Sequence, residues 1–205
     1  MNILEIKNLN LQRSDKVIFR DLNLFVKEGD ISLWFGPSGC GKSSLAKLIT
    51  GQLSDFQGQL LFSGVQVAGA ALDRFYVCHE NDLFLWQTLN EHIDFITENT
   101  KQFATESEIA EFVRVLEIEH LLGRYPRSFS MGETRRAQIL RSLILKPKLT
   151  IFDETFSALD LKLKNRIMPE LQKIWKRQKA TVIIITHESE KDFNISVDQA
   201  RDFST

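Results

Sequence analysis

Short apolar runs alternate with longer helical patterns along the chain. Residues 149–152 and 181–186 are apolar and rich in β-branched side chains, which is typical of parallel strands buried on both faces. Residues 31–35 form a third apolar strand candidate, and a glycine-rich segment follows it. The next pattern is helical from residue 43 and ends at Gly51, a residue type that favours helix ends. Together these patterns predict a parallel sheet with helical connections.

Other segments predict an antiparallel flank. Residues 4–9 and 21–27 have the pattern of flanking strands. Residues 60–67 predict a hairpin that turns at Ser63-Gly64, and residues 74–78 predict a short strand.

From residue 81 to about residue 142 the character of the chain is helical. Thr105 to Glu108 fit a capping box, in which a threonine is followed three residues later by a glutamate. Apolar residues then follow at helical spacing. They are Ile109, Phe112, Val113 and Leu116.

A second helical pattern, beyond residue 160, carries many basic residues. Apolar residues at helical spacing supply a stripe to bury, so the basic residues fit a solvated helix face. A surface for membranes or nucleic acid is the alternative. The basic residues are Lys162, Lys164, Arg166, Lys173, Lys176, Arg177 and Lys179, and the apolar stripe is Leu163, Ile167, Leu171, Ile174 and Trp175.

Length, net charge, apolar runs and cysteines limit the classes of protein to which the chain can belong. A length of 205 residues suits one α/β domain with an ample core. The net charge of −1 gives no global attraction to nucleic acid, so no nucleic-acid partner is expected. The longest apolar runs are far shorter than the roughly 18 residues that span a bilayer, and no signal peptide is expected. Cys40 and Cys78 are interpreted as reduced cytosolic thiols.

Residues 36–43 fit the P-loop spacing G-x-x-x-x-G-K-[ST], between a strand candidate and a helix. Glycines let successive backbone N–H groups point at phosphate oxygens, reinforced by the positive end of the helix. Lys42 is expected to reach the β- and γ-phosphates, and the Ser43 hydroxyl to hold Mg²⁺. We therefore predict a nucleoside triphosphate site. Its candidate residues are Gly36, Pro37, Ser38, Gly39, Cys40, Gly41, Lys42, Ser43 and Ser44.

The strand pattern at residues 149–152 ends in Asp153-Glu154. In a P-loop ATPase the first carboxylate holds Mg²⁺ through water, and the second can accept a proton from the attacking water. Many strands end in acidic residues, so the pair is informative only together with the P-loop. A third motif, Phe129 to Glu133, places Ser130 and Gly132 before a long helical pattern. It fits either a plain helix cap or a second anion site at a helix N-terminus.

The order of these motifs resembles that of the ATP-binding cassette (ABC) ATPases over almost the whole chain. The segments that carry the resemblance are the P-loop, Phe129 to Glu133, Phe152 to Glu154, Ser157 to Asp160, and Thr186-His187. The P-loop and the segment from Asp153 to Asp160 look most like subunits of bacterial binding-protein-dependent importers. The implied fold class is α/β: a P-loop NTPase (RecA-like) core with an antiparallel β flank and an inserted α-helical subdomain. The implied cassette has its ATP-binding core at 1–79 and 143–205 and its helical subdomain at 80–142.

The resemblance also implies roles for single residues. Ser130 and Gly132 fall in the signature that contacts the γ-phosphate of ATP held by a second cassette. Glu154 falls on the catalytic base, Asp160 on the loop that crosses the dimer interface, and His187 on the histidine that contacts the γ-phosphate. The implied cofactors are ATP and Mg²⁺. The implied partners are a second cassette, identical or similar, transmembrane permease subunits, and a substrate-binding protein. The implied location is the cytoplasmic face of the inner membrane.

This chain departs from the family pattern at several positions. Arg13 stands where an aromatic ring usually stacks on adenine, so it is either a guanidinium replacement or an exposed solvated arginine. His79 aligns with the glutamine that senses Mg²⁺, so it is either a metal ligand or an ordinary loop histidine. Thr155 replaces a proline. In the signature, Met131 replaces a glycine and Glu133 replaces a glutamine.

The sequence therefore predicts an ATP-hydrolysing subunit that powers a separate permease, most similar to importer subunits. An exporter or lipid-transport motor remains an alternative, as does a soluble ABC ATPase outside transport. A P-loop kinase or GTPase would leave Ser130, Gly132 and His187 unexplained.

Overall fold

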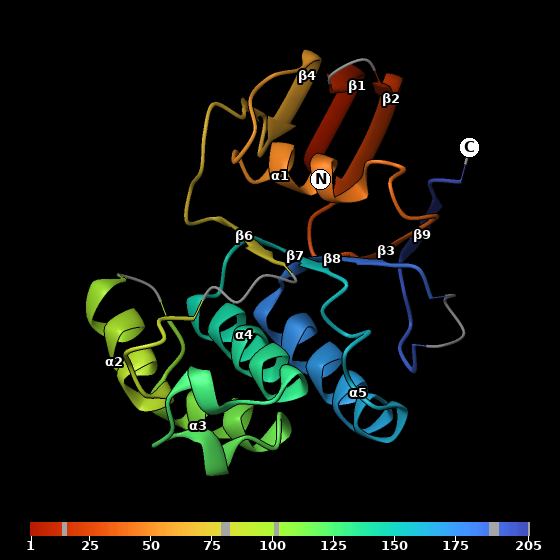
Figure 1. The fold of residues 1–205 in the computed structure, drawn as a ribbon. Helices are drawn as coiled ribbons and strands as arrows, with labels where there is room; N and C mark the ends of the chain where they lie inside the picture. Colours follow the sequence, from red (N-terminus) through yellow and green to blue (C-terminus); the bar gives the residue numbers. More distant parts are fainter. Residues whose placement is uncertain (14–15, 79–82, 101–102, 189–192, 205) are drawn as a thin grey trace.

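The computed structural model describes residues 1–13, 16–78, 83–100, 103–188 and 193–204. In the described residues, one helix lies between the two sheets, two helices cover the outer face of the second sheet, and two more pack on these helices (Figure 1). The first sheet has the order β2-β1-β4-β5 and the second the order β6-β7-β8-β3-β9. The mixed α/β architecture with an antiparallel flank agrees with the predicted fold class.

The antiparallel sheet is formed by β1 (Asn2–Arg13), β2 (Lys16–Lys27), β4 (Gln57–Phe62) and β5 (Val65–Gln66). β4 and β5 form the predicted hairpin, and both turn residues, Ser63 and Gly64, have positive φ. β1 and β2 extend beyond the predicted runs because they pair along almost their whole lengths, through several register shifts.

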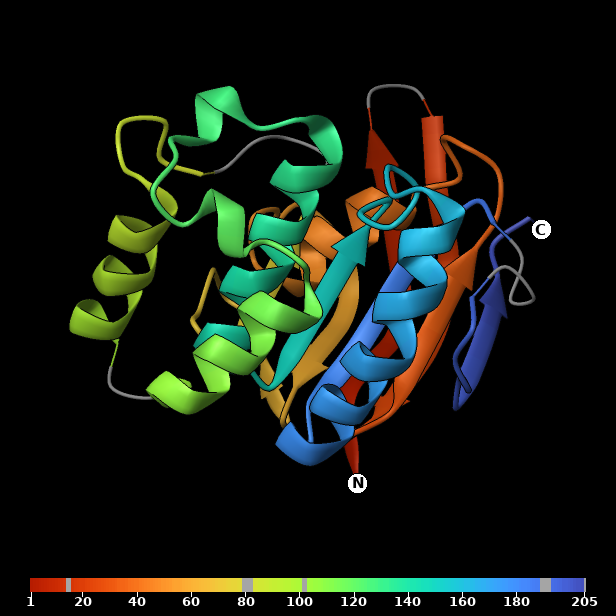
Figure 2. The same cartoon turned by 90° about the horizontal axis from the view of Figure 1, so that it is seen from below.

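The parallel sheet contains β3 (Ile31–Phe35), β6 (Arg74–Val77), β7 (Leu149–Asp153), β8 (Thr181–Thr186) and β9 (Gln199–Asp202). Every residue of β7 and β8 is buried. Figure 2 shows α4 and α5 lying across one face of this sheet. The opposite face packs on α1 and the antiparallel sheet. Burial on both faces explains the continuous apolar runs that predicted these strands.

The helices are α1 (Lys42–Ile49), α2 (Leu89–Asn99), α3 (Glu106–Val115), α4 (Met131–Leu145) and α5 (Leu161–Gln178). Two short 3-10 helices, Glu119–Leu121 and Pro126–Ser128, lie between α3 and α4. The capping box predicted at Thr105 is present: Thr105 Oγ1 accepts from the Glu108 backbone N–H, and the Glu108 carboxylate accepts from the Thr105 N–H. The division predicted between residues 142 and 143 falls inside α4.

Several basic residues of α5 form ion pairs. Arg166 pairs with Glu117, and Arg177 pairs with Glu111. Lys164 is buried against Glu188. The apolar stripe of the same helix is buried as predicted. This arrangement favours the solvated helix face over a membrane or nucleic-acid surface.

A substitution at Gly51, directly after α1, tests how closely the backbone packs around this residue. Its φ is +75°, and a Cβ built there would lie 2.1 Å from the backbone of Gly69. Gly51→Ala should therefore destabilise the fold by on the order of 3 kcal/mol, through backbone strain and steric overlap. The free energy of unfolding in urea measures this.

Gly123→Ala is the matched control, because Gly123 is exposed and a Cβ at this residue would have no heavy atom within 4 Å. Its unfolding free energy should change by less than about 0.5 kcal/mol. Equal stability of the two variants would contradict the close approach of residues 51 and 69.

Candidate functional site

The sequence motifs meet at the carboxyl-terminal edge of the parallel sheet. β3 pairs with β8 so that Phe35 lies opposite Thr186, and β7 pairs with β8 so that Asp153 lies opposite Ile185. The segments that leave these strands therefore start side by side. They are the P-loop, Glu154 and His187.

The P-loop owes its shape to three glycines with positive φ: Gly36 (145°), Gly39 (79°) and Gly41 (105°). A Cβ on Gly41 would lie 2.4 Å from Ile18 Cγ2, so β2 leaves no room for a side chain there. Gly41 is the N-cap of α1 and provides no side-chain cap. The first N–H groups of a helix lack partners within the helix, so this end of α1 is a ready anion site.

Lys42 is held inside the loop that it belongs to. Its side chain is buried, and Nζ donates to the carbonyl oxygens of Gly36 at 2.7 Å and Pro37 at 3.1 Å. Nζ also lies 3.4 Å from Cys40 Sγ. The two carbonyl oxygens stabilise the Lys42 ammonium group without neutralising its charge. The positive charge therefore remains available to an anion.

A cavity of about 340 Å³ lies between the P-loop and the end of β7. It brings together most of the predicted phosphate and metal residues. Its lining is Ile18, Ser38, Gly39, Gly41, Lys42, Ser43, Ser44, Asp153 and Glu154.

Glu154 has a left-handed backbone conformation, with φ at 51°. Such conformations in residues other than glycine are costly and are often found at functional sites. The Glu154 N–H donates to Ile185 O at 3.0 Å, which ties the strained residue to β8. Its carboxylate Oε2 accepts from Ser157 Oγ at 2.7 Å and lies 3.0 Å from His187 Nδ1. Both contacts use Oε2, so Oε1 is the oxygen that can accept a proton from water.

Asp153 is buried at the end of β7, and its Oδ2 accepts a hydrogen bond from the Tyr76 hydroxyl at 2.5 Å. Burial raises the pKa of Tyr76, and the hydrogen bond to Asp153 raises this pKa further. The phenol is therefore a fixed donor over the physiological pH range.

The oxygen ligands predicted for Mg²⁺ fit that ion. Ser43 and Asp153 line the same cavity, and Mg²⁺ is commonly held by one or two protein oxygens together with substrate phosphates. The third predicted metal residue, His79, lies outside the described residues.

The signature residues lie elsewhere. Ser130 caps α4, where its Oγ accepts from the Glu133 N–H at 3.3 Å. The position of a Cβ on Gly132 would be 3.6 Å from Ala158 O, so the signature lies beside the segment that leads to Asp160. Neither Ser130 nor Gly132 lines the cavity at the P-loop.

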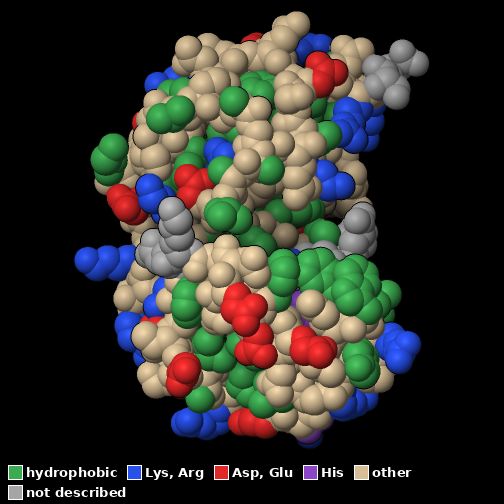
Figure 3. All heavy atoms as spheres, turned by 90° about the vertical axis from the view of Figure 1, so that its left-hand side faces the viewer, with side chains coloured by type: hydrophobic (Ala, Val, Ile, Leu, Met, Phe, Trp, Pro, Cys, Tyr) green, Lys and Arg blue, Asp and Glu red, His purple; other side chains and the backbone are tan. Residues whose placement is uncertain are grey.

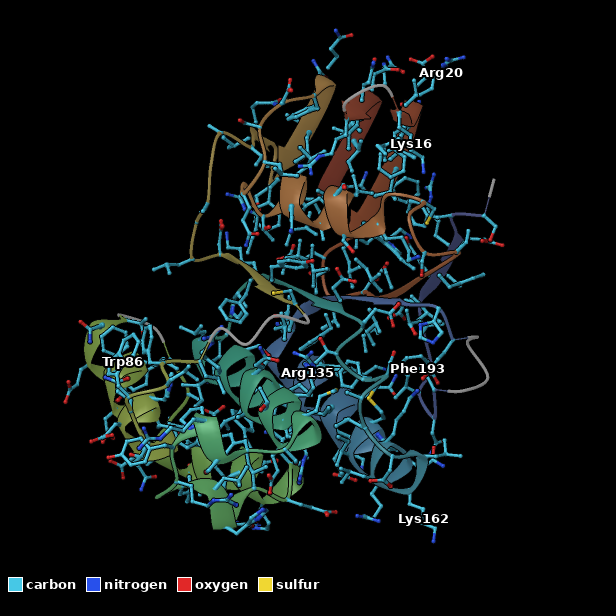
Figure 4. All side chains as sticks on the ribbon, in the orientation of Figure 1. Lys16, Arg20, Trp86, Arg135, Lys162 and Phe193 are labelled. Atoms are coloured by element: carbon cyan, nitrogen blue, oxygen red, sulfur yellow. The ribbon has the colours of Figure 1, made fainter. Side chains whose placement is uncertain are left out.

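Arg13 is exposed at the end of β1 and does not line that cavity either. Its cross-strand partner Lys16 donates to Gly39 O at 3.4 Å, so Lys16 is the basic residue of this hairpin that contacts the P-loop (Figure 4). Sequence reasoning missed Lys16 and Tyr76, and it gave no role to Ser157, although Ser157 begins one of the segments that carry the resemblance. Their contacts depend on the tertiary arrangement.

Comparison with known proteins is consistent with this geometry. The family model described as ABC transporter matches residues 19–157. The aliphatic sulfonates import ATP-binding protein SsuB of Bacillus licheniformis is 31% identical over 171 residues, covering 83% of this chain and 67% of the relative. The spermidine/putrescine import ATP-binding protein PotA of Spiroplasma citri is 30% identical over 203 residues, covering 95% of this chain and 57% of the relative.

A solved structure gives the same fold. It is the dimeric post-hydrolysis state of the ATP-binding cassette MJ0796 bound to ADP and Pi, with a TM-score of 0.76 and 23% identity. The match covers 90% of this chain and 88% of that chain.

Lys42→Ala should weaken ATP binding by roughly 10- to 100-fold, because the phosphates lose a charge-assisted hydrogen bond. Fluorescence titration with a labelled nucleotide measures the affinity. Lys47→Ala is the control, since Lys47 lies in the last turn of the same helix and does not line the cavity. Wild-type affinity in Lys42→Ala would rule out the P-loop as the phosphate site.

Glu154→Gln should bind ATP normally but hydrolyse it roughly 10²-fold more slowly or worse, from loss of the general base. Phosphate release measures hydrolysis, and size exclusion in ATP should show an accumulated dimer. If hydrolysis continues at the normal rate, another group activates the water, and His187 is then the next candidate.

Proposed function

Because this chain belongs to the ABC transporter family of ATP-binding cassettes, we propose that it is the ATPase subunit of a bacterial importer. The observation that carries the proposal is the cavity at the sheet edge, where Lys42, Asp153 and Glu154 meet. Named relatives that match most of the chain are import ATP-binding proteins. The proposed division is an ATP-binding core (1–79 and 143–205) and a helical subdomain (80–142).

The chemistry follows from the positions of these side chains. The phosphates of ATP bind at the N-terminus of α1, where Lys42 exchanges its carbonyl partners for phosphate oxygens. Ser43 and Asp153 would hold Mg²⁺, and the ion would neutralise charge on the β- and γ-phosphates. Glu154 accepts a proton from the attacking water. Contacts with Ser157 and His187 fix the carboxylate for this role.

The site is complete only with a second cassette. Ser130 and Gly132 lie outside the P-loop cavity of their own chain. In the proposed dimer, the α4 N-terminus of each protomer meets the γ-phosphate bound by its partner. The partner is a second copy of this chain or a similar cassette.

We place the permease contact on the helical subdomain. A groove of about 690 Å³ lies between α2 and α3. Its ionisable lining is four acidic residues, Asp94, Glu98, Glu106 and Glu119, against one basic residue, Arg114. The apolar lining includes Ile93, Phe103, Ile109, Val113 and Leu122. Figure 3 shows acidic and hydrophobic side chains together on the face that includes this subdomain.

This groove fits a cytoplasmic segment of a membrane protein. Cytoplasmic loops of membrane proteins carry an excess of Lys and Arg, which complements an acidic rim. An apolar floor suits the apolar face of a helix. Next to α2, Trp86 is 72% exposed and stacks on Phe84 with ring centroids 5.3 Å apart, which adds a separate apolar surface outside the groove lining (Figure 4). Such exposed aromatic rings are common at protein interfaces.

Among the described residues, no helix is long and apolar enough to span a membrane. We propose that the cassette binds a separate permease at the cytoplasmic face of the inner membrane, in a complex with a substrate-binding protein. The relatives are named for anionic sulfonates and for cationic polyamines, at 31% and 30% identity. Similarity at this level assigns no cargo, so the permease and the binding protein select it.

Ala110→Arg tests the docking proposal, because Ala110 lines the groove and is exposed. The large cationic side chain would repel a basic partner and fill the groove. With the permease subunits co-expressed, the wild type should sediment with membranes, and the variant should bind them at least about tenfold more weakly, an energy on the order of 1.4 kcal/mol. ATP binding should not change.

Ala68→Arg is the control, since Ala68 is exposed and lies outside the groove. Normal sedimentation of Ala110→Arg would show that the permease docks at another surface of the cassette. A wild type that never sediments with any co-expressed membrane partner would favour a soluble ABC ATPase instead.

A further inference from the structure

Tyr76 lies in β6, where it pairs with Ile151 of β7. Alternate residues of a strand point to the same face, so Ile151 and Asp153 share the face of the sheet that packs on α1. Tyr76 and Ile151 belong to the hydrophobic cluster on that face. The ring of Tyr76 is buried in this cluster, and its hydroxyl reaches past Ile151 to the carboxylate at the end of β7.

The contact is short and directed at one oxygen. The hydroxyl donates to Asp153 Oδ2 at 2.5 Å, which is in the range of a hydrogen bond between a hydroxyl and a charged carboxylate. Among the described residues, Tyr76 is the only hydrogen-bond partner of this side chain. Ser43, the other predicted metal residue, lines the same cavity as Asp153. The hydroxyl therefore holds one of the two oxygen ligands that meet at this cavity.

We propose that Tyr76 is a positioning residue for the metal site: its hydroxyl holds Asp153 through Oδ2 and leaves Oδ1 for the water shell of Mg²⁺. The inference rests on the proposed Mg²⁺–ATP site. Groups that hydrogen-bond a metal ligand orient it, and their loss commonly costs 10- to 100-fold in metal affinity. A free carboxylate on a strand end would lose rotational freedom on binding metal, whereas Asp153 has already lost it.

A purely structural role is the competing explanation, since a buried tyrosine hydroxyl needs a partner in any protein. The two roles differ in what Tyr76→Phe changes. A structural role affects stability and every ligand equally. A positioning role affects only the part of ATP affinity that depends on Mg²⁺.

The experiment uses the Glu154→Gln background, in which ATP is turned over too slowly to disturb equilibrium. ATP affinity is measured in EDTA and in saturating Mg²⁺, and the ratio of the two is the metal-dependent gain. Tyr76→Phe keeps the ring in the core and should reduce this gain about tenfold. Affinity in EDTA should stay within about twofold, since the phosphate-binding loop is untouched.

Thr50→Val is the matched control. Thr50 is buried, and its hydroxyl donates to Ala46 O at 2.9 Å at the far end of α1. This variant also loses a buried hydroxyl bond and should keep the full metal-dependent gain. Thermal unfolding of both variants shows whether the loss of stability is comparable.

An unchanged gain in Tyr76→Phe overturns the proposal, and so does an equal loss of affinity with and without Mg²⁺. If the parent protein itself shows no metal-dependent gain, the proposed Mg²⁺ site is wrong. That outcome is distinct from a failure of Tyr76 alone, because it appears before Tyr76 is changed.

Discussion

The hydrogen-bond register of the parallel sheet is the constraint on which the site depends. β7, β8 and β3 are adjacent, and their carboxyl ends are level: Asp153 pairs with Ile185, and Phe35 pairs with Thr186. The sheet is buried on both faces, so charged and polar chemistry is confined to its ends. A shift of one residue between β7 and β8 would move Asp153 to the other face of the sheet, away from α1. The P-loop and the two carboxylates would then no longer face one cavity.

Apolar runs predicted the buried strands because segments without charged side chains are stable only when they are buried. Thr181–Thr186 is apolar or β-branched throughout, and it forms a strand with the predicted limits. β9 was not predicted, since Gln199–Asp202 has no strand pattern. It forms because the free edge of β3 offers backbone partners, with Ser32 opposite Gln199. Edge pairing of this kind depends on the assembled sheet and leaves little trace in a local sequence.

The same distinction applies to the site. Residues of the P-loop lie within one segment, so their spacing alone predicted them. Tyr76 and Asp153 are 77 positions apart, and Glu154 and His187 are 33 apart. These pairs form only after β6, β7 and β8 align. Lys42 shows a further limit: its position was predictable, but its bonds to Gly36 O and Pro37 O follow from a loop conformation that three glycines allow. Phosphates that bind there compete with carbonyl groups, which hold an ammonium less strongly than a carboxylate does.

Glu133, the departure from the family signature, is explained by the N-terminus of α4. Its Oε2 accepts from the Ser130 N–H at 2.8 Å, while Ser130 Oγ accepts from the Glu133 N–H. Its Oε1 lies 3.0 Å from His120 Nε2, and Arg124 is 3.8 Å away. The backbone bond to Ser130 and the contact with His120 lower the pKa of Glu133 to about 2, so the group is charged at neutral pH.

A charge at the place proposed to face a γ-phosphate would repel ATP if it were free. Both oxygens of Glu133 are instead engaged within their own protomer, by Ser130 and His120. A glutamine could form the same capping box, since its amide oxygen accepts the same N–H group. The carboxylate adds a favourable interaction with the positive end of the helix, typically about 0.3–1 kcal/mol. The N–H groups of the first helical turn, Met131 and Gly132 among them, have no partner within the helix. They can therefore still face an anion, so the replacement of glutamine by glutamate is compatible with the proposed composite site.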